Sequence, residues 1–358
     1  MSRLKNVLDL GVKYLTGNDP MAMIYFVTKR CNAKCAHCFY WESLNARRPN
    51  ELKLEELESI TASIGRLLYL RLSGGEPFLR KDIFDLIGIF VKNCAPSYIG
   101  IPSNGFYTDR IVAFAKRTGE LKTRVEIGLS IDDLGEHHDR VRGSKGAFEK
   151  ALQTFKALKE VKKHVPSLSV GFITTAIKSN QSRLIELFDC LQALEPDGIA
   201  CNIVRDDTKV PEEKDIDHEI SQKFSDLCDD YGNSRSAGRN DFFSRMRQEK
   251  TLLAHEIRQK TLATNSFQIP CVGGTNMIVM YADGEVHPCE TLGYEIGNIR
   301  DFDLNMMELL RSERARSIRS KIINENCFCT HECFTTASIT FRKKQLLRVA
   351  ARAITASQ

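Results

Sequence analysis

The chain has 358 residues, of which 42% are hydrophobic and 27% are charged, and its formal net charge is +5. This composition is that of an ordinary soluble protein, and no apolar run approaches the roughly eighteen residues needed to span a bilayer, so a transmembrane helix is excluded. The length permits one α/β barrel with an appendage.

The N-terminal residues 1–21 predict a short amphipathic helix, "LKNVLDLGVKYL". They lack the continuous apolar stretch and small-residue cleavage site of a secretory signal, so we expect the protein to stay in the cytoplasm. Twelve cysteines in a reducing compartment are not expected to form disulfides. Those at 31, 35 and 38 and at 327, 329 and 333 are spaced as metal ligands are.

Residues 22–205 alternate six β-rich runs, such as "MIYFVT" and "LYLRLSGGE", with amphipathic helical patterns. This rhythm predicts an α/β fold with parallel strands and right-handed crossovers, and six repeats favour a partial (β/α)6 barrel over a closed eight-stranded one. Ligands of such sheets bind at the carboxyl ends of the strands. The first cysteine group directly follows the first strand, so we expect it at that rim.

The remaining chain predicts three further segments. Residues 206–265 are charge-dense and predict a helical bridge with helices near 216–231 and 240–263. Residues 266–340 predict a small module made of a β-hairpin turning at Asp283-Gly284, a helix over about 304–322 and the run "CFCTHEC". Residues 341–358 predict a basic amphipathic tail.

The first cysteine group, Cys31, Cys35 and Cys38, has the spacing C-x3-C-x2-C. It offers three thiolates, whereas a structural zinc site needs four ligands. Three thiolates suit a four-iron cluster whose fourth iron stays open to an exogenous ligand.

These residues resemble the radical S-adenosylmethionine (SAM) superfamily, whose signature C-x3-C-x-aromatic-C follows the first strand of a partial barrel. The resemblance implies a [4Fe-4S] cluster that binds SAM, with His37 in the aromatic position beside the adenine. It also implies that the "SGGEP" segment receives the methionyl amino group of SAM, through Gly74, Gly75 and Glu76. A carboxylate pairs well with an ammonium group, and glycines permit close approach of the backbone.

Further SAM contacts are implied at the ends of later strands. "LSIDD" resembles the family's ribose-contacting segment and points to Ser130 and Asp132, and the following "HDRVRG" supplies Arg142 for the SAM carboxylate. Ser103 and Asn104 lie at the matching end of the third strand. Residues of these types at strand ends also cap helices and turns, which is the alternative for each of them.

The second module resembles the SPASM and twitch modules that hold auxiliary iron-sulfur clusters. Cys271 and Cys289 frame the pattern C-x12-G-x4-C, and the terminal run is C-x-C-x3-C. Five thiolates cannot ligate two four-iron clusters, so the resemblance implies one auxiliary [4Fe-4S] cluster held by Cys271, Cys289, Cys333 and either Cys327 or Cys329. A zinc site that uses cysteines or His331 is the alternative.

Glu290 directly follows Cys289, and in sulfatase-maturing relatives a carboxylate at this position acts as the base that deprotonates the substrate. We expect burial near a cluster to raise the pKa of such a carboxylate toward neutral pH. A surface carboxylate that only follows a ligand is the alternative. The auxiliary cluster would accept an electron from a substrate radical if all four irons are ligated, and would bind substrate if one iron is open. Five cysteines leave this choice undecided.

The predicted function is that of a radical SAM oxidoreductase, which cleaves SAM to a 5'-deoxyadenosyl radical, takes electrons from flavodoxin or ferredoxin and abstracts a substrate hydrogen. The substrate is a small molecule, a carbohydrate-like molecule or a peptide, and the alternative activity is that of a peptide maturase of the sulfatase-maturase or RiPP type. A non-catalytic iron-sulfur or zinc protein that binds nucleic acid or a partner is the alternative class. The basic tail predicts docking on the barrel or contact with an anionic membrane surface, and we do not expect nucleic-acid binding.

Overall fold

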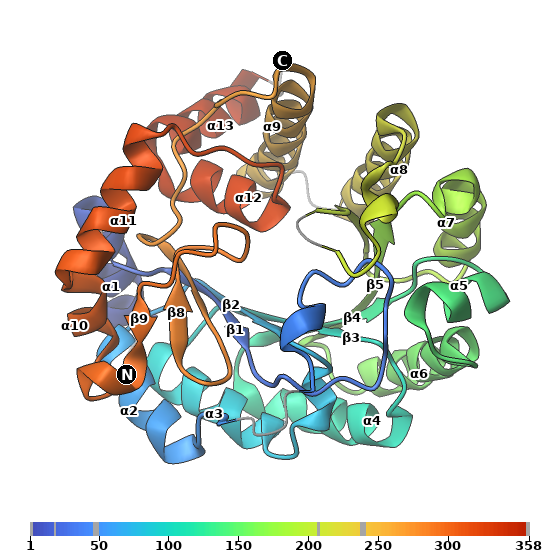
Figure 1. Ribbon diagram of the computed structural model, residues 1–358, viewed down its shortest axis with the longest axis horizontal. Coiled ribbons are helices and arrows are strands. Elements are labelled where there is room, and N and C mark those ends of the chain that lie inside the picture. Colours follow the sequence, from blue (N-terminus) through green and yellow to red (C-terminus); the bar gives the residue numbers. More distant parts are fainter. Residues whose placement is uncertain (1–2, 18, 46–49, 206–207, 237–240, 356–358) are drawn as a thin grey trace.

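The computed structural model describes the chain except residues 1–2, 18, 46–49, 206–207, 237–240 and 356–358. One curved sheet forms its centre, with strand order β6-β5-β4-β3-β2-β1-β7-β8-β9 (Figure 1). The strands of the barrel are β1 (Ala22–Phe26), β2 (Tyr69–Ser73), β3 (Tyr98–Ser103), β4 (Arg124–Ser130), β5 (Leu168–Ala176) and β6 (Ile199–Ile203). All neighbouring pairs among these six are parallel, which confirms the predicted α/β partial barrel.

Helices cover the outer face of this sheet (Figure 1). The crossover helices are α2 (Leu54–Ile64), α3 (Ile83–Cys94), α4 (Thr108–Arg117), α5 (Gly135–Arg142), α6 (Ala147–Lys162) and α7 (Leu184–Gln192). Alternate residues of each strand enter this core; on β1 these are Met23 and Tyr25, while Ala22, Ile24 and Phe26 pack on the inner face. Fully burying a large apolar side chain contributes about 1.5–3 kcal/mol to stability. A slip of β1 by one residue would exchange the side chains of its two faces and lose this packing, so burial on both faces fixes its register.

The C-terminal module extends the same sheet. Strand β7 (Met277–Met280) pairs in parallel with β1, and the antiparallel strands β8 (Glu285–His287) and β9 (Gly297–Asn298) follow it. The predicted turn is present, and Gly284 has the positive φ of 93° that a tight hairpin favours. The module is therefore part of the barrel sheet, because "MIVM" is buried along its whole length against the edge of β1.

The single helix predicted over 304–322 is wrong, since two helices occupy this region: α10 (Met306–Arg311) and α11 (Glu313–Asn324). Ser312 separates them. Its backbone is extended, with φ −58° and ψ 158°, and its hydroxyl accepts a hydrogen bond from the Ala315 amide at 3.1 Å. The apolar periodicity continues across Ser312, but an N-cap of this kind starts a new helix.

The two helices of the bridge have different neighbours. Helix α8 (His218–Ser236) packs on β6 and α7, whereas α9 (Phe242–Thr264) packs on α12 (Glu332–Phe341) and α13 (Lys343–Thr355). The C-terminal part of helix α1 (Arg3–Thr16) lies close to the N-terminus of α13, where the Lys343 side chain donates a hydrogen bond to the Leu15 carbonyl at 3.2 Å.

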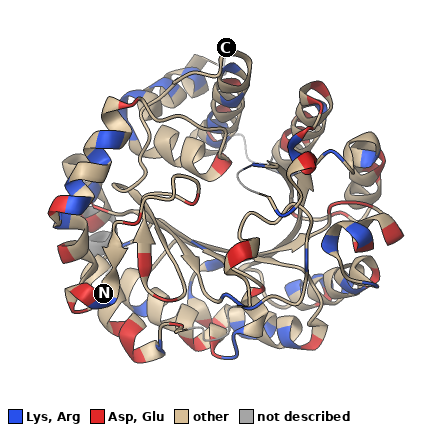
Figure 2. Ribbon diagram, in the orientation of Figure 1, with Lys and Arg blue, Asp and Glu red and all other residues tan. Residues whose placement is uncertain are grey.

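The basic tail forms α13 and docks on α9. Val349 and Ala353 are buried, and Arg352 bonds to Glu249 at 2.8 Å and to Glu256 at 2.7 Å. Figure 2 shows that Lys and Arg (blue) and Asp and Glu (red) lie largely on the surrounding helices, including this pair. None of the helices in the described part of the chain combines the length and apolar character required to cross a bilayer.

Candidate functional site at the carboxyl ends of the strands

The loop after β1 carries Cys31, Cys35 and Cys38 and is held by neighbouring backbone. The amides of Lys34 and Ala36 donate to carbonyls at the end of α5, at 2.9 and 3.0 Å. At the start of the loop, the Asn45 side chain makes two hydrogen bonds of 3.0 Å with the backbone of Cys31. These bonds hold three thiols on one short segment at the rim of the barrel.

Gly74 and Gly75 allow the end of β2 to lie against this loop. A Cβ atom on Gly75 would come within 2.1 Å of the Arg30 carbonyl oxygen, and one on Gly74 within 2.5 Å of the Thr28 carbonyl oxygen. Gly74 also has a φ of 117°, which side-chain-bearing residues rarely adopt. The two glycines thus have a structural role in positioning the cysteine loop in addition to the ligand contact that was predicted.

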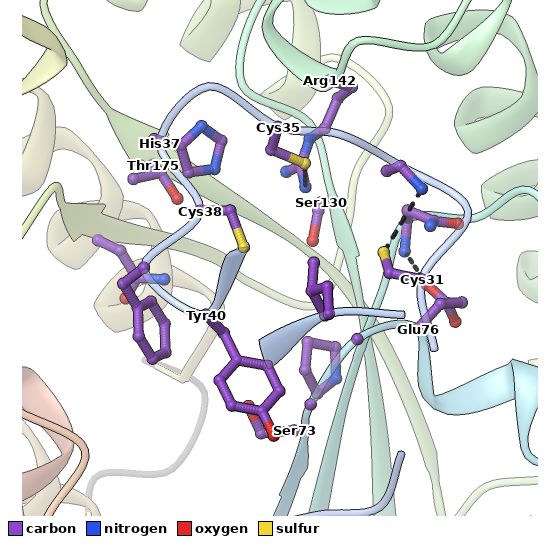
Figure 3. A pocket seen from close by; sticks show the side chains of 18 of the residues that line it. Cys31, Cys35, His37, Cys38, Tyr40, Ser73, Glu76, Ser130, Arg142 and Thr175 are labelled. Atoms are coloured by element: carbon purple, nitrogen blue, oxygen red, sulfur yellow. Dashed lines mark hydrogen bonds between the residues drawn. The ribbon is translucent and has the colours of Figure 1, made fainter. Parts of the chain in front are cut away.

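Most of the predicted cofactor-binding residues surround one cavity (Figure 3). Its walls include Cys31, Cys35, His37, Cys38, Gly74, Gly75, Glu76, Ser103, Asn104, Ser130 and Arg142. Burial raises the pKa of the Cys31 thiol to about 12 and that of Cys38 to about 11. Thiolates in this loop therefore need a compensating positive charge, which the irons of a cluster supply.

Glu76 is a buried carboxylate that accepts three hydrogen bonds. Its oxygens accept from the Phe78 amide at 3.1 Å, the Ser103 hydroxyl at 2.9 Å and the Asn104 amide at 2.8 Å. Burial nevertheless raises its pKa to about 7, and among the described residues no cationic side chain lies within ion-pair distance of it. The cavity thus contains a carboxylate that an incoming ammonium group would complement.

Asp132 does not line the cavity. It is fully buried, its carboxylate pairs with the Arg142 guanidinium at 2.7 Å, and it accepts from the Thr175 amide at 2.9 Å. Arg142 also donates to the Cys35 sulfur at 3.6 Å, and His37 lies 3.7 Å from Asp132. The ribose contact predicted for Asp132 thus remains a prediction, while the structure shows Asp132 holding two cavity residues, Arg142 and His37.

Sequence reasoning missed four polar residues of this cavity, Tyr40, Thr175, Asn202 and Arg205. Thr175 lies near the end of β5, while Asn202 and Arg205 lie at and just after the end of β6. The signal was available, because polar residues at the carboxyl ends of parallel strands had already selected Ser103 and Asn104.

In the C-terminal module, Cys271, Cys327 and Cys329 line a second, smaller cavity beneath α9 and α12. Burial raises the pKa of Cys327 to about 11 and that of Cys329 to about 12, and negative charge on Cys271 and Cys289 adds to both shifts. These four thiols are therefore electrostatic neighbours. No group of three His, Cys, Asp or Glu side chains in the described ranges converges tightly enough to hold a single metal ion.

Cys333 lies in other surroundings, in the first turn of α12. Although burial opposes ionisation, Arg71 on β2 and His331 lower the pKa of Cys333 to about 7. Arg71 shares the inner face of β2 with Tyr69 and Ser73, because Leu70 and Leu72 between them enter the outer core. Cys333 therefore faces a cation inside the barrel.

Glu290 is buried and bonds to His331, and Arg205 contacts both, at 3.8 Å from Glu290 and 3.2 Å from His331. The expectation that the pKa of Glu290 is raised toward neutral pH is wrong. Burial alone would raise its pKa, but the charges of His331 and Arg205 outweigh burial and lower it. Glu290 is thus a charged member of a polar network that reaches the first cavity through Arg205.

Comparison with known proteins agrees with this arrangement. Residues 25–191 match the family model of the radical SAM superfamily, and the chain belongs to that superfamily. Residues 271–334 match the SPASM iron-sulfur cluster-binding domain, so the chain is a radical SAM enzyme with a C-terminal SPASM module. Together the two domains imply [4Fe-4S] clusters and SAM as cofactors.

Two curated relatives are named for heme-related syntheses. The pre-heme d1 synthase of Dinoroseobacter shibae is 33% identical over 206 residues, which are 56% of this chain and 48% of that protein. The AdoMet-dependent heme synthase of Methanosarcina barkeri is 26% identical over 296 residues, which are 79% of this chain and 80% of that protein. The chain thus spans about half the length of the first relative and most of the second.

The fold resembles that of solved radical SAM enzymes. Streptococcus suis SuiB, whose structure was solved bound to S-adenosylmethionine, superposes with a TM-score of 0.59 at 16% identity. The match covers 88% of this chain and 72% of that one. At this identity, the likeness supports the fold.

Proposed function

We propose that this chain is a radical SAM oxidoreductase whose substrate binds inside the barrel, between the SAM cavity and the cysteines of the C-terminal module. The observation that carries this proposal is the joint placement of three thiols and the Glu76 carboxylate around one cavity at the carboxyl ends of the strands. Three thiols with an adjacent ligand cavity suit a four-iron cluster with one open iron.

Different residues of the cavity would bind the cluster and the separate parts of SAM. Cys31, Cys35 and Cys38 would ligate three irons of the cluster. Glu76 would accept the ammonium group, and it is already oriented by the Ser103 hydroxyl and the Asn104 amide. A carboxylate fixed in advance in this way loses little conformational freedom when the ligand arrives.

Arg142 would bind the carboxylate of SAM, and Asp132 would act as its positioning residue. The buried Asp132–Arg142 pair restricts the guanidinium to the cavity wall beside Cys35. Ser130 and His37 line the same cavity and are the proposed contacts to the nucleoside part. Burial lowers the pKa of His37, so the ring is neutral at physiological pH and suited to contact with adenine.

Cys31, Cys35 and Cys38 would hold a cluster that, when reduced, would supply the electron for cleavage of SAM to methionine and a 5'-deoxyadenosyl radical, and this radical would abstract a hydrogen atom from the substrate. The protein holds the reacting groups in place and limits the access of water. Buried apolar side chains such as Ile24 and Phe26 on the inner face of β1 contribute to this exclusion.

The second half of the reaction would use the C-terminal module. The cysteines of this module would hold an auxiliary cluster, which would supply an acceptor for the electron of a substrate radical, and a nearby carboxylate would accept the accompanying proton. Glu290 is the proposed proton acceptor, because its carboxylate is ionised and belongs to a polar network that reaches the first cavity through Arg205. The reductant for the first cluster would be a flavodoxin or ferredoxin.

The names of the two heme-related relatives support a small-molecule substrate of the tetrapyrrole type. The match to the heme synthase covers 79% of this chain and 80% of that protein.

The proposal is tested by reconstituting the full chain with iron and sulfide in the absence of oxygen, then adding dithionite and SAM. Mass spectrometry should detect 5'-deoxyadenosine and methionine in equal amounts. Cys35→Ala should abolish both products, whereas Cys190→Ala on α7, outside both cysteine groups, should not. A reconstituted wild-type protein that carries its clusters and yields no 5'-deoxyadenosine would refute the proposal and favour a non-catalytic iron-sulfur protein.

A further inference from the structure

Arg71 lies in the middle of β2, on the inner face of the barrel sheet, and it is not among the residues proposed to bind SAM. We infer that its guanidinium binds a carboxylate of the substrate inside the barrel. This inference deepens the proposed function, on which it rests, because it assigns a residue to the acidic side chains that a substrate of the tetrapyrrole type carries.

The sheet gives the Arg71 side chain no charged neighbour on either adjoining strand. In register with it are Ile24 on β1, which packs in the apolar cluster of the inner face, and Gly100 on β3, which has no side chain. Glu126 follows in the same row, but it lies two strands away, or about 10 Å across the sheet. The Tyr98 hydroxyl reaches into this row, 3.0 Å from where a Cβ atom of Gly100 would lie, and burial raises its pKa, so it stays a hydrogen-bond donor.

The guanidinium of Arg71 has no anionic partner in contact with it. None of the ion pairs within the described part of the chain includes Arg71, and Cys333 and Glu126 act on it only at longer range. Arg71 is nevertheless exposed to solvent, although Leu70 and Leu72 on either side of it are buried. Because helices cover the outer face of the sheet, the water that reaches Arg71 lies inside the barrel. An accessible cation without a contacting carboxylate is able to bind an anion that enters from outside.

Helix α12 fills one side of the barrel interior and leaves the other side open. Phe334 and Phe341 on this helix pack against the inner faces of β1 and β7, within the curve of the sheet (Figure 1). Across the barrel, Ala200 on the inner face of β6 is exposed, as Arg71 is. Asn202, the next residue on that face, lines the SAM cavity. The open side of the interior is therefore continuous with the strand ends where SAM would bind.

Arg71 lies at a depth that suits the proposed reaction. Ser73, two residues further along the same face of β2, lines the SAM cavity, and two residues of a strand span about 7 Å. On the side of the C-terminal module, the positive charge of Arg71 acts on Glu290, the proposed proton acceptor. A guanidinium binds both oxygens of a carboxylate through parallel N–H donors. A carboxylate held in this way would place the rest of the substrate between SAM and Glu290.

The test measures the binding of a tetrapyrrole with and without its charge. Protoporphyrin IX, a fluorescent tetrapyrrole that bears carboxylates, is titrated with the anaerobically reconstituted full chain in the presence of SAM, and its fluorescence gives the dissociation constant. Arg71→Gln should weaken binding about 10- to 160-fold, because hydrogen bonds between two charged groups are lost. Arg71→Lys keeps the charge without the planar fork and should give an intermediate affinity. The carboxamide derivative of the porphyrin should bind the wild type and Arg71→Gln alike, and Arg316→Gln, exposed on α11, is the matched control.

The inference is overturned if the wild type does not bind the porphyrin, or if Arg71→Gln binds it as tightly as the wild type does. If Arg71 only balances the charge of an auxiliary cluster near Cys333, Arg71→Gln should shift the electron paramagnetic resonance (EPR) signal of that cluster and leave the porphyrin affinity unchanged. If the glutamine variant loses its fold, the carboxamide derivative also binds less tightly, and Arg71→Lys then decides.

The binding measurement needs no turnover. A wild-type chain that yields no 5'-deoxyadenosine refutes the proposed function whether or not the porphyrin binds. A chain that cleaves SAM, but whose porphyrin affinity does not depend on Arg71, refutes this inference alone.

Discussion

Glu76→Gln tests how the cavity recognises SAM. The substitution removes the charge that would meet the ammonium group, and a hydrogen bond to a charged partner contributes about 1.5–3 kcal/mol. It also places an amide N–H₂ group where both carboxylate oxygens now accept hydrogen bonds, from Phe78 and Ser103 on one and from Asn104 on the other. The lost acceptor affects the protein with or without SAM, so the loss in SAM affinity is that of the charged partner, about 1.5–3 kcal/mol or about 10- to 160-fold.

The assay is equilibrium dialysis of radiolabelled SAM against anaerobically reconstituted protein, with Glu120→Gln, on the exposed turn after α4, as the control. Misfolding of the variant is checked separately by measuring its stability. Burial raises the pKa of Glu76, so the ligand-free wild-type protein loses stability as the pH rises from the usual pKa of a glutamate through about 7. The ligand-free glutamine variant should therefore unfold at pH 8 no more easily than wild type. A loss of affinity below threefold would refute the role of Glu76.

Three further results follow from the same contacts. SAM affinity of the wild type should fall about tenfold per pH unit below pH 7, because a protonated Glu76 cannot pair with an ammonium group, and this slope should be missing in Glu76→Gln. Asp132→Asn should lower the free energy of unfolding by about 3–5 kcal/mol, measured by urea denaturation, because it leaves Arg142 buried without its partner; a change under 1 kcal/mol contradicts this. Glu290→Gln should still cleave SAM and lose conversion of substrate, measured by parallel mass spectrometry of 5'-deoxyadenosine and product, and full conversion would exclude Glu290 as the base.

The parts of the site that the sequence predicted depend on short segments. The spacing of Cys31, Cys35 and Cys38 and the "SGGEP" run are read within a few residues of one another, and strand-helix alternation locates them at one rim. The same reasoning could not find the pairing of β7 with β1, which joins segments some 250 residues apart and depends on burial of both edges.

The sequence also could not predict which role a residue has when its type and position fit more than one. Asp132 fits a ribose contact by its position, but its carboxylate is used by Arg142 and the Thr175 amide, and only packing reveals this. The terminal cysteines show the same limit. The motif groups Cys333 with Cys329, and only the structure shows that Cys333 lies in the first turn of α12 and packs in one cluster with Cys271 and Cys289.

The claim that the first cavity joins a cluster to SAM is tested most directly by EPR spectroscopy of the reduced cluster on Cys31, Cys35 and Cys38. Measured in the full chain with Cys271 and Cys289 replaced by alanine, so that the first cluster alone is observed, its g values should shift on addition of SAM. Glu76→Gln should need far more SAM for the same shift. A spectrum that stays unchanged at saturating SAM would contradict the account.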